Sequence, residues 1–451
     1  MGSQTAAAPQ TPARGGLQVD LGFDTKLTVD DNYQLQPNSS GTSTFWDNTF
    51  TFDLSSVTGV QDLNLTASGV YRYGQIPGRT VSGLEDPTVR FRYTRDGLNS
   101  RLDVNARYRH VAREFLDPFQ VEQEDRNAIL TGLFLPGGGT VTYRNAGIDY
   151  VTGLNDPFML ALSLSHDQTS YDSVATAANP LLFGNKTDSA SATATFKFSQ
   201  ITALYFQLGI DEYKAEDSVR TERTTDSFAV GLTHDIDPAL ALDAQIGYTD
   251  VETTTTGGTA SVDGLTGAVT LTKTLTNGTV YGSVDSSVNE NGTTTSLSFG
   301  RDLQLPLGNL TAVVGGTYTP SGDTYVTGSL LLTRQLKTSD LTLAIDRGVS
   351  TNTSSADVVD TRVSFTYGYA INNNSRLSLS LNWGQSESVL AGAAPTVERT
   401  TLDAAYSYDL TQDWALTGGV SIRTRSDSTS PGDARSNAVF LGLGRSFSYR
   451  P

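Results

Sequence analysis

The sequence predicts an all-β protein, a single closed antiparallel transmembrane β-barrel of about 22 strands with short periplasmic turns and longer extracellular loops. Three observations in the 451 residues predict this fold class: apolar and polar side chains alternate, tight turns recur at regular intervals, and aromatic residues gather at both ends of the alternating segments. No stretch approaches the roughly 20 consecutive apolar residues that a membrane-spanning helix needs, so helical insertion is excluded.

Alternation in segments of about ten residues places successive side chains on opposite faces of a strand. In residues 17–24, for example, Leu, Val, Leu and Phe alternate with Gln, Asp, Gly and Asp, and residues 62–73 and 402–408 follow the same rule. We count 22 such segments, an even number that suits a closed barrel. Residues 17–449 are therefore the predicted barrel, and residues 1–16 are expected to be a flexible N-terminal segment, a cloning scar joined to the mature N-terminus.

Tight turns join the segments in pairs, and generally longer polar loops lie between the pairs. Outer-membrane barrels have short turns on the periplasmic side and longer loops outside, so we expect both termini in the periplasm. The predicted turns are residues 57–60, 96–99, 153–156, 199–201, 236–238, 274–278, 303–308, 336–340, 370–375 and 409–413.

Aromatic residues give a second indication, because Tyr and Trp prefer the two boundaries between lipid and water. One strand register places most of them near the turn side and the others near the loop side, which predicts two aromatic girdles. The expected girdle residues are Tyr93, Tyr367, Tyr369, Tyr406, Tyr408, Trp414, Phe447 and Tyr449 on the turn side, and Tyr71, Tyr73 and Tyr108 on the loop side.

A soluble all-β protein, such as a sandwich array or a surface adhesin, would also show alternation, because each of its sheets buries one face. A soluble sheet of this length would need a second layer over its apolar face, whereas lipid covers that face in a barrel and closure removes the sheet edges. No second layer is visible in the sequence. The barrel is therefore the preferred interpretation, and a soluble adhesin is an alternative.

The composition excludes several functions. A net charge of −17 argues against nucleic acid as a partner, since duplex binding depends on basic residues. The absence of cysteine removes disulfides, thiolate metal sites and cysteine nucleophiles. The three histidines, His110, His166 and His234, fall in different segments, and no nucleophile or zinc motif accompanies them. We therefore expect no enzyme, no cofactor and no metal site.

The repeated aliphatic and aromatic hairpins, such as Ser-Tyr-Asp-Leu-Thr at 407–411, and a closing strand that ends in Phe447 and Tyr449 resemble the β-barrel porins of Gram-negative bacteria. The resemblance spans residues 17–449, and some related barrel families are associated with exopolysaccharide export. It implies a place in the Gram-negative outer membrane. The chain departs from the usual aromatic last residue, because Arg450 and Pro451 follow Tyr449.

The longest connection, residues 111–138, is the candidate constriction. Asp117 and Pro118 suit the start of a short helix, and glycines at 137–139 suit its end. We expect this loop to fold inward and narrow the lumen, the alternative being an external loop that rests on the rim. Its expected acidic residues are Asp117, Glu122, Glu124 and Asp125. About 16 residues precede the first strand, too few for a folded plug, so an energised uptake receptor is not expected.

A set of arginines in neighbouring segments occupies the polar positions of the alternation, so these side chains should lie together on the lumen wall. Such a basic ladder offers fixed charged donors to carboxylates or phosphates and would attract anionic solutes. The alternative is that these arginines only pair with lumen acids such as Asp62 and Asp103. The ladder residues are Arg72, Arg90, Arg92, Arg101, Arg107 and Arg109.

These observations predict an outer-membrane, porin-like channel for passive passage of hydrophilic solutes, anionic or saccharide in character. One alternative is a structural barrel, or one associated with an export complex, without an open pore. The expected partners are outer-membrane lipid and lipopolysaccharide, hydrophilic solutes and, under that alternative, periplasmic export components.

Overall fold

The computed structural model describes residues 16–117, 119, 138–172, 182–351, 357–388, 396–428 and 432–450. Within these ranges the chain forms 22 strands and one short 3-10 turn, η1 (Arg113–Phe115). The strands are β1 (Gly16–Asp30), β2 (Ser43–Val57), β3 (Gln61–Ile76), β4 (Arg79–Asp96), β5 (Ser100–Ala112), β6 (Thr140–Thr152), β7 (Phe158–Asp172), β8 (Asn185–Lys197), β9 (Thr202–Ala215), β10 (Glu222–Asp237), β11 (Leu240–Thr255), β12 (Gly258–Leu275), β13 (Gly278–Asn289), β14 (Gly292–Leu305), β15 (Gly308–Tyr318), β16 (Thr324–Gln335), β17 (Ser339–Thr351), β18 (Asp357–Asn372), β19 (Ser375–Ser388), β20 (Val397–Asp409), β21 (Trp414–Asp427) and β22 (Ala434–Tyr449).

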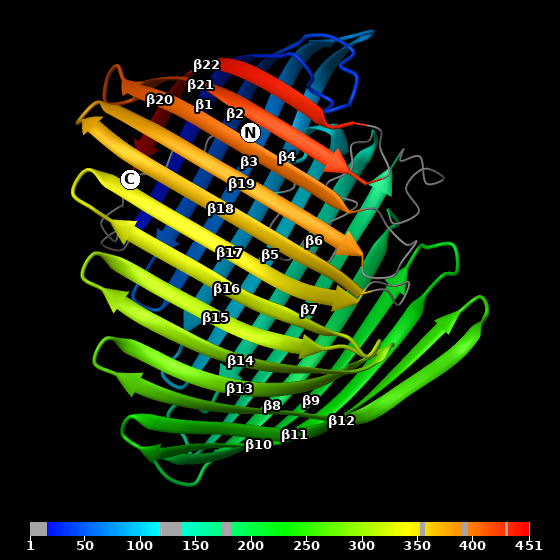
Figure 1. The fold of residues 1–451 in the computed structure, drawn as a ribbon. Coiled ribbons are helices and arrows are strands. Elements are labelled where there is room, and N and C mark those ends of the chain that lie inside the picture. The colour runs from blue at the N-terminus through cyan, green and yellow to red at the C-terminus, as the bar shows by residue number, and fades with distance from the viewer. Residues whose placement is uncertain are drawn as a thin grey trace.

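All these strands belong to one antiparallel sheet that closes on itself. Each strand pairs with its neighbours in sequence, and the first and last strands also pair, with Val19 opposite Tyr449 and Asp30 opposite Ala438. Figure 1 shows the blue first strand and the red last strand side by side in the wall of the barrel. Closure leaves the described sheet without a free edge. The predicted fold class, a closed antiparallel barrel of 22 strands, is confirmed.

The two faces of the sheet differ in chemistry, as alternation requires. On β1 the side chains of Leu17, Leu21 and Leu27 are exposed on the outer face, whereas Gln18 and Asp30 are buried on the inner face. The register carries the same division from strand to strand, because residues directly opposite each other point to the same face. The outer face therefore presents apolar side chains, and the inner face carries most of the charged ones.

The two ends of the barrel also differ. Both described termini lie at one end, here called the turn end, where the connections span two to five residues. Residues 31–42 form the first connection at the opposite end, here called the loop end. Three loop-end connections are two-residue turns, namely 77–78, 256–257 and 290–291, so loop length varies there more than the sequence pattern indicates. Within the described residues, no helix is long and apolar enough to cross a membrane.

Glycines on the inner face make room for tyrosine rings from the adjacent strand. A Cβ added at Gly300 would overlap the ring of Tyr281, which lies directly opposite on β13. Gly231 of β10 accommodates the ring of Tyr205 in the same way. These two positions need glycine because the neighbouring aromatic ring occupies the place of a side chain.

Candidate solute-binding wall of the barrel

The structure brings the six ladder arginines together on the inner face of β3, β4 and β5. Arg90 lies directly opposite Arg107, and Thr88 opposite Arg109. The same inner-face register includes Arg92 and Arg101 on β4 and β5 and continues to Arg72 on β3. The alternation in the sequence therefore predicted the common face of all six arginines correctly. Their role in binding solutes stays a prediction.

Some ladder arginines pair with acids of the wall. Arg72 forms two hydrogen bonds with Asp47 at 2.7 and 2.8 Å, and both side chains are largely buried. Arg101 pairs with Asp103 at 2.8 Å, and its side chain is about half exposed. These pairs show that part of the ladder satisfies acids of the wall itself, as the alternative interpretation expects.

Arg109 is held by an irregularity that the sequence pattern does not reveal. The pairing of β3 with β4 shifts between Ser68 and Val70, which leaves Asp86 and Pro87 outside the ladder of paired residues. Asp86 adopts a left-handed backbone conformation with φ of 49°. Its carboxylate accepts two hydrogen bonds from Arg109, at 2.7 and 2.8 Å. The bulge therefore aims a carboxylate at the arginine row.

An aromatic cluster connects the ladder to the loop end. Tyr33 of the 31–42 connection, Phe45 of β2 and Phe115 of η1 pack against one another, with ring centroids 4.6 to 6.0 Å apart. The Arg72 guanidinium lies 4.0 Å from the Phe115 centroid and 5.2 Å from that of Phe45. Arg72 is therefore fixed by a carboxylate and by two rings, and such stacking is a particular property of arginine.

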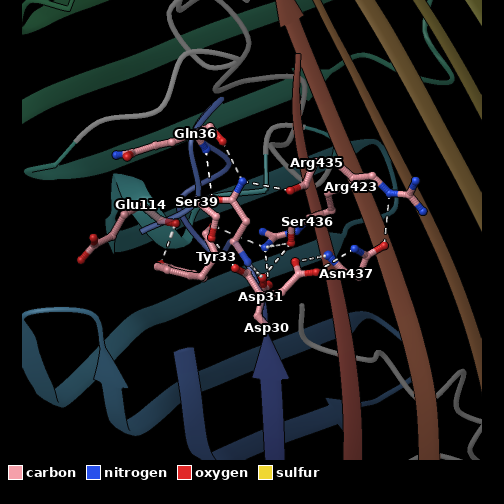
Figure 2. A network of polar contacts seen from close by, with 11 residues as sticks. Asp30, Asp31, Tyr33, Gln36, Ser39, Glu114, Arg423, Arg435, Ser436 and Asn437 are labelled. Carbon is pink, nitrogen blue, oxygen red and sulfur yellow. Dashed lines mark hydrogen bonds and ion pairs between the residues drawn. The ribbon is translucent and has the colours of Figure 1, made fainter. Parts of the chain in front are cut away.

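Figure 2 shows a polar network where the 31–42 connection meets the last strands. Arg423 of β21 donates to Asp30 at 2.5 Å, and Ser436 of β22 donates to the same carboxylate at 2.8 Å. Asp31 accepts two bonds from Asn437, each 2.7 Å long. Because β21 and β22 are the last strands of the described sheet, this network joins them to the first loop-end connection.

The titration of two groups in the 31–42 connection reflects their surroundings. Burial, followed by the charge of Glu114, raises the pKa of Tyr33 well above its usual value. Partial burial of Asp31 would raise its pKa, but the hydrogen bonds from Asn437 outweigh this and leave the pKa below its usual value. Tyr33 is therefore a neutral donor at ordinary pH, and Asp31 is a carboxylate.

The described base of the 111–138 connection lies on the inner side of the wall. Leu116 packs against Val111, Val141 and Tyr143, which all belong to the inner face. Arg79 of β4 pairs with Glu114 in η1. Of the four acids expected in this connection, Asp117 is described. Glu122, Glu124 and Asp125 lie outside the described residues, as does the predicted helix.

A second arginine group was missed by the sequence reasoning. Arg399 of β20 and Arg423 and Arg425 of β21 lie on the inner face near the loop end. Asp117 interacts electrostatically with Arg399, so the base of the 111–138 connection extends toward β20. The alternation in these segments could have predicted that the three arginines face the lumen. Their proximity to the ladder could not be predicted, because it depends on the pairing of β1 with β22. The arginine wall is defined here as the six ladder residues together with Arg399, Arg423 and Arg425.

All eleven expected girdle residues lie on the outer face. Tyr93, for example, lies opposite Leu63 and Val104, and Tyr367 opposite Leu341 and Leu379. At the turn end, the Arg445 guanidinium lies 5.1 Å from the centroid of Trp414 and 4.1 Å from that of Phe447. Their position at a lipid boundary stays a prediction. The others on this face are Tyr71, Tyr73, Tyr108, Tyr369, Tyr406, Tyr408 and Tyr449.

The histidines do not meet in a catalytic arrangement in the described chain. His166 lies 2.5 Å from Asp188 on the outer face, whereas the adjacent Asp167 accepts from Asn145 on the inner face. His110 and His234 each contact a threonine hydroxyl of a neighbouring strand. The described residues include no group of three metal-binding side chains.

Comparisons by sequence give no relatives: no family model matches the chain, and no curated protein matches it. Solved structures do share its fold. The iron transporter FrpB from Neisseria meningitidis (F3-3 variant) aligns with a TM-score of 0.60 at 10% identity, over 96% of this chain and 81% of that one. The siderophore receptor PirA from Acinetobacter baumannii gives a TM-score of 0.57 at 10% identity, over 97% and 81%. The ferric-catecholate import receptor Fiu from E. coli K12 gives 0.57 at 12% identity, over 97% and 82%.

The chain therefore shares the fold of Gram-negative outer-membrane β-barrels. Identities near 10% show the shared fold and do not transfer a cargo. The comparisons do not support the resemblance to porins or to exopolysaccharide-associated barrels. The matched proteins are described as receptors and transporters.

The expected passive, porin-like function is wrong, and so is the expectation that excluded an energised uptake receptor. The solved barrels that match along nearly the whole chain are described as transporters and receptors for iron and siderophores, and another as a copper transporter. The alternatives, an export-associated barrel and a soluble adhesin, are not supported either. The error arose because a period-two pattern predicts the wall of a barrel and carries no information about how solute crosses it.

Proposed function

We propose that this barrel is an outer-membrane receptor and transporter that binds an anionic iron chelate of the siderophore class at its arginine wall. The names of the matched structures support this cargo class. The observation that carries the proposal is the direct opposition of Arg90 and Arg107 on the inner face. Two guanidinium groups in directly opposed positions can together offer forked donors to the oxygens of one anionic group.

The proposed ligand fits the chemistry of the arginine wall. Guanidinium groups donate two parallel hydrogen bonds to carboxylates and keep their charge at all physiological pH values. The inner faces of β3, β4 and β5 hold the six ladder arginines, and those of β20 and β21 hold three more. An anionic chelate is therefore attracted to this side of the lumen although the net charge of the chain is −17.

The 111–138 connection is proposed to narrow the lumen beside this wall. The packing of Leu116 against the inner face and the stacking of Phe115 on Arg72 support this role. Asp117, Glu122, Glu124 and Asp125 would then face the arginines and compete with the solute. The aromatic girdles are proposed to set the depth of the barrel in lipid and lipopolysaccharide.

Uptake of radiolabelled iron tests the proposal in cells that lack other receptors for the chelate. We expect saturable uptake of an anionic ferric chelate when the protein is present, and loss of that uptake after an uncoupler is added. The double variant Arg90→Gln, Arg107→Gln should reduce uptake at least tenfold. Arg334→Gln, which changes an exposed outer-face arginine opposite Leu341, is the matched control.

Two results would overturn the proposal, provided that immunoblotting shows equal amounts of each variant in the outer membrane. One is equal uptake with and without the protein. The other is uptake that rises linearly with concentration and is indifferent to the uncoupler, since this is the behaviour of passive diffusion.

A further inference from the structure

Two arginines of the last strands oppose each other on the inner face near the loop end. The register places Arg399 of β20 directly opposite Arg425 of β21, and Thr401 opposite Arg423 at the next inner position. Like charges in directly opposed positions are unfavourable unless an anion lies between or beside them. Sheet pairing therefore holds two guanidinium groups close together.

Burial makes the close approach of the two guanidinium charges more unfavourable. The Arg425 side chain is 5% exposed, and it pairs with Asp427 at 3.4 Å. The Nε atoms of Arg399 and Arg425 are both buried and lack a hydrogen-bond acceptor in the described part of the protein. Buried donors are normally satisfied, so these N–H groups point to an acceptor that the described residues do not provide.

The nearby acidic side chains of the described residues do not accept a hydrogen bond from either of these Nε atoms. Asp30 accepts from Arg423, and Asp427 pairs with Arg425. Asp117 interacts with Arg399 by charge alone, without an ion pair. Arg425 and the neighbouring Val397 and Ala434 are buried, whereas Arg399 is partly exposed, so the pair can be reached from the side of Arg399.

We propose that Arg399 and Arg425 form an oxyanion site that binds a carboxylate or phosphate group of a small hydrophilic solute. The forked donors of two adjacent guanidinium groups match the oxygens of either anion. The site deepens the proposed function and rests on it for the identity of the transported solute. Binding of the anionic group itself is a separate property that can be measured on the purified barrel.

Isothermal titration of the full chain in detergent tests this site, with citrate and inorganic phosphate as probes and sucrose as the neutral control. We expect both anions to bind and sucrose not to bind. Arg399→Gln with Arg425→Gln should weaken anion binding at least tenfold. Arg399→Lys with Arg425→Lys should bind the anions with intermediate affinity, because lysine keeps the charge and lacks the parallel donors of the guanidinium group. A stronger effect on citrate than on phosphate would identify carboxylate as the preferred group, and the reverse would identify phosphate.

Arg334→Gln is the matched control and should bind both anions as the unchanged protein does. Asp117→Asn supplies an independent variant outside the strands, and it should tighten anion binding several-fold by removing a competing carboxylate. Unchanged affinity in the Gln double variant, or no anion binding at millimolar concentration, would overturn the site. If the Gln double variant does not fold, unchanged or weaker binding by Asp117→Asn would overturn it.

The two proposals fail separately. Anion binding that depends on Arg399 and Arg425, without chelate uptake in cells, would overturn the proposed function and leave the site in place. Normal chelate uptake in cells, without anion binding that depends on Arg399 and Arg425, would overturn the site and leave the proposed function in place.

Discussion

The phenol of Tyr33 donates a hydrogen bond of 2.8 Å to the main-chain carbonyl of Glu114. This contact joins the first loop-end connection to η1, at the base of the connection that is proposed to narrow the lumen. The ring of Tyr33 also packs on Phe45 and Phe115. One side chain therefore links two loop-end segments to the arginine wall.

Removing this link should loosen the loop end in two steps. Tyr33→Phe keeps the ring and loses the hydrogen bond, so we expect it to lower the free energy of unfolding by about 1 kcal/mol. Tyr33→Ala also loses the ring and should cost about 3 to 5 kcal/mol. Urea unfolding in lipid vesicles, followed by tryptophan fluorescence, measures both. Equal losses for the two variants would show that the ring packing contributes nothing.

Alkaline pH should act through the same residue. Burial raises the folded-state pKa of Tyr33 well above the usual value, so its stabilising contribution is complete below about pH 10 and is lost as pH rises through the folded-state pKa. Phenolate absorbance should show Tyr33 among the tyrosines that ionise late. In Tyr33→Phe the amplitude of the late step should fall by one tyrosine, and an unchanged late amplitude would contradict the assignment.

The junction of the first and last strands should depend on Asp30 and much less on Asp31. Asp30→Asn leaves Arg423 without its carboxylate in a buried place, and we expect it to cost about 3 to 5 kcal/mol of unfolding free energy. Asp31→Asn removes an exposed charge and should cost less than about 1 kcal/mol. Thermal unfolding of the two variants under identical conditions makes the comparison. A larger loss for Asp31→Asn would contradict the network in Figure 2.

Glycine positions on the inner face offer a test of the packing between strands. Gly300→Ala would force the Tyr281 ring to move and should destabilise the barrel by about 1 to 3 kcal/mol. Gly348→Ala is the control, because nothing lies within 4 Å of the added methyl group. The temperature at which each variant unfolds on a gel reports the difference. Equal temperatures would argue against the overlap of Tyr281 with Gly300.

The sequence predicted the wall of the barrel well and its interior poorly. Period-two alternation is a local property, so the strand number and the common face of Arg90 and Arg107 followed from it directly. The group of Arg399 and Arg425 lies within a few strands of the ladder only because β1 pairs with β22. Such closure depends on the whole sheet. The inward packing of Leu116 and the bulge that aims Asp86 at Arg109 also depend on contacts between distant residues.

The mode of transport was predicted wrongly for a related reason. Residues 17–449 contain the pattern of a barrel wall, and that pattern is shared by barrels that carry solutes in different ways. The choice between them depends on what binds inside, which is decided by side chains from strands far apart in sequence.

Cysteine labelling tests the central claim, that an aqueous inner face with a wall of arginines binds the solute while the outer face meets lipid. The chain has no cysteine, so single substitutions are specific reporters. Thr66→Cys lies on the inner face opposite Arg90, and Leu65→Cys lies on the outer face opposite Phe91. In intact outer membranes we predict that a hydrophilic maleimide labels the first and not the second, and that an anionic ferric chelate slows the first reaction. Equal labelling of both positions, or a rate at the first that the chelate does not change, would contradict the account.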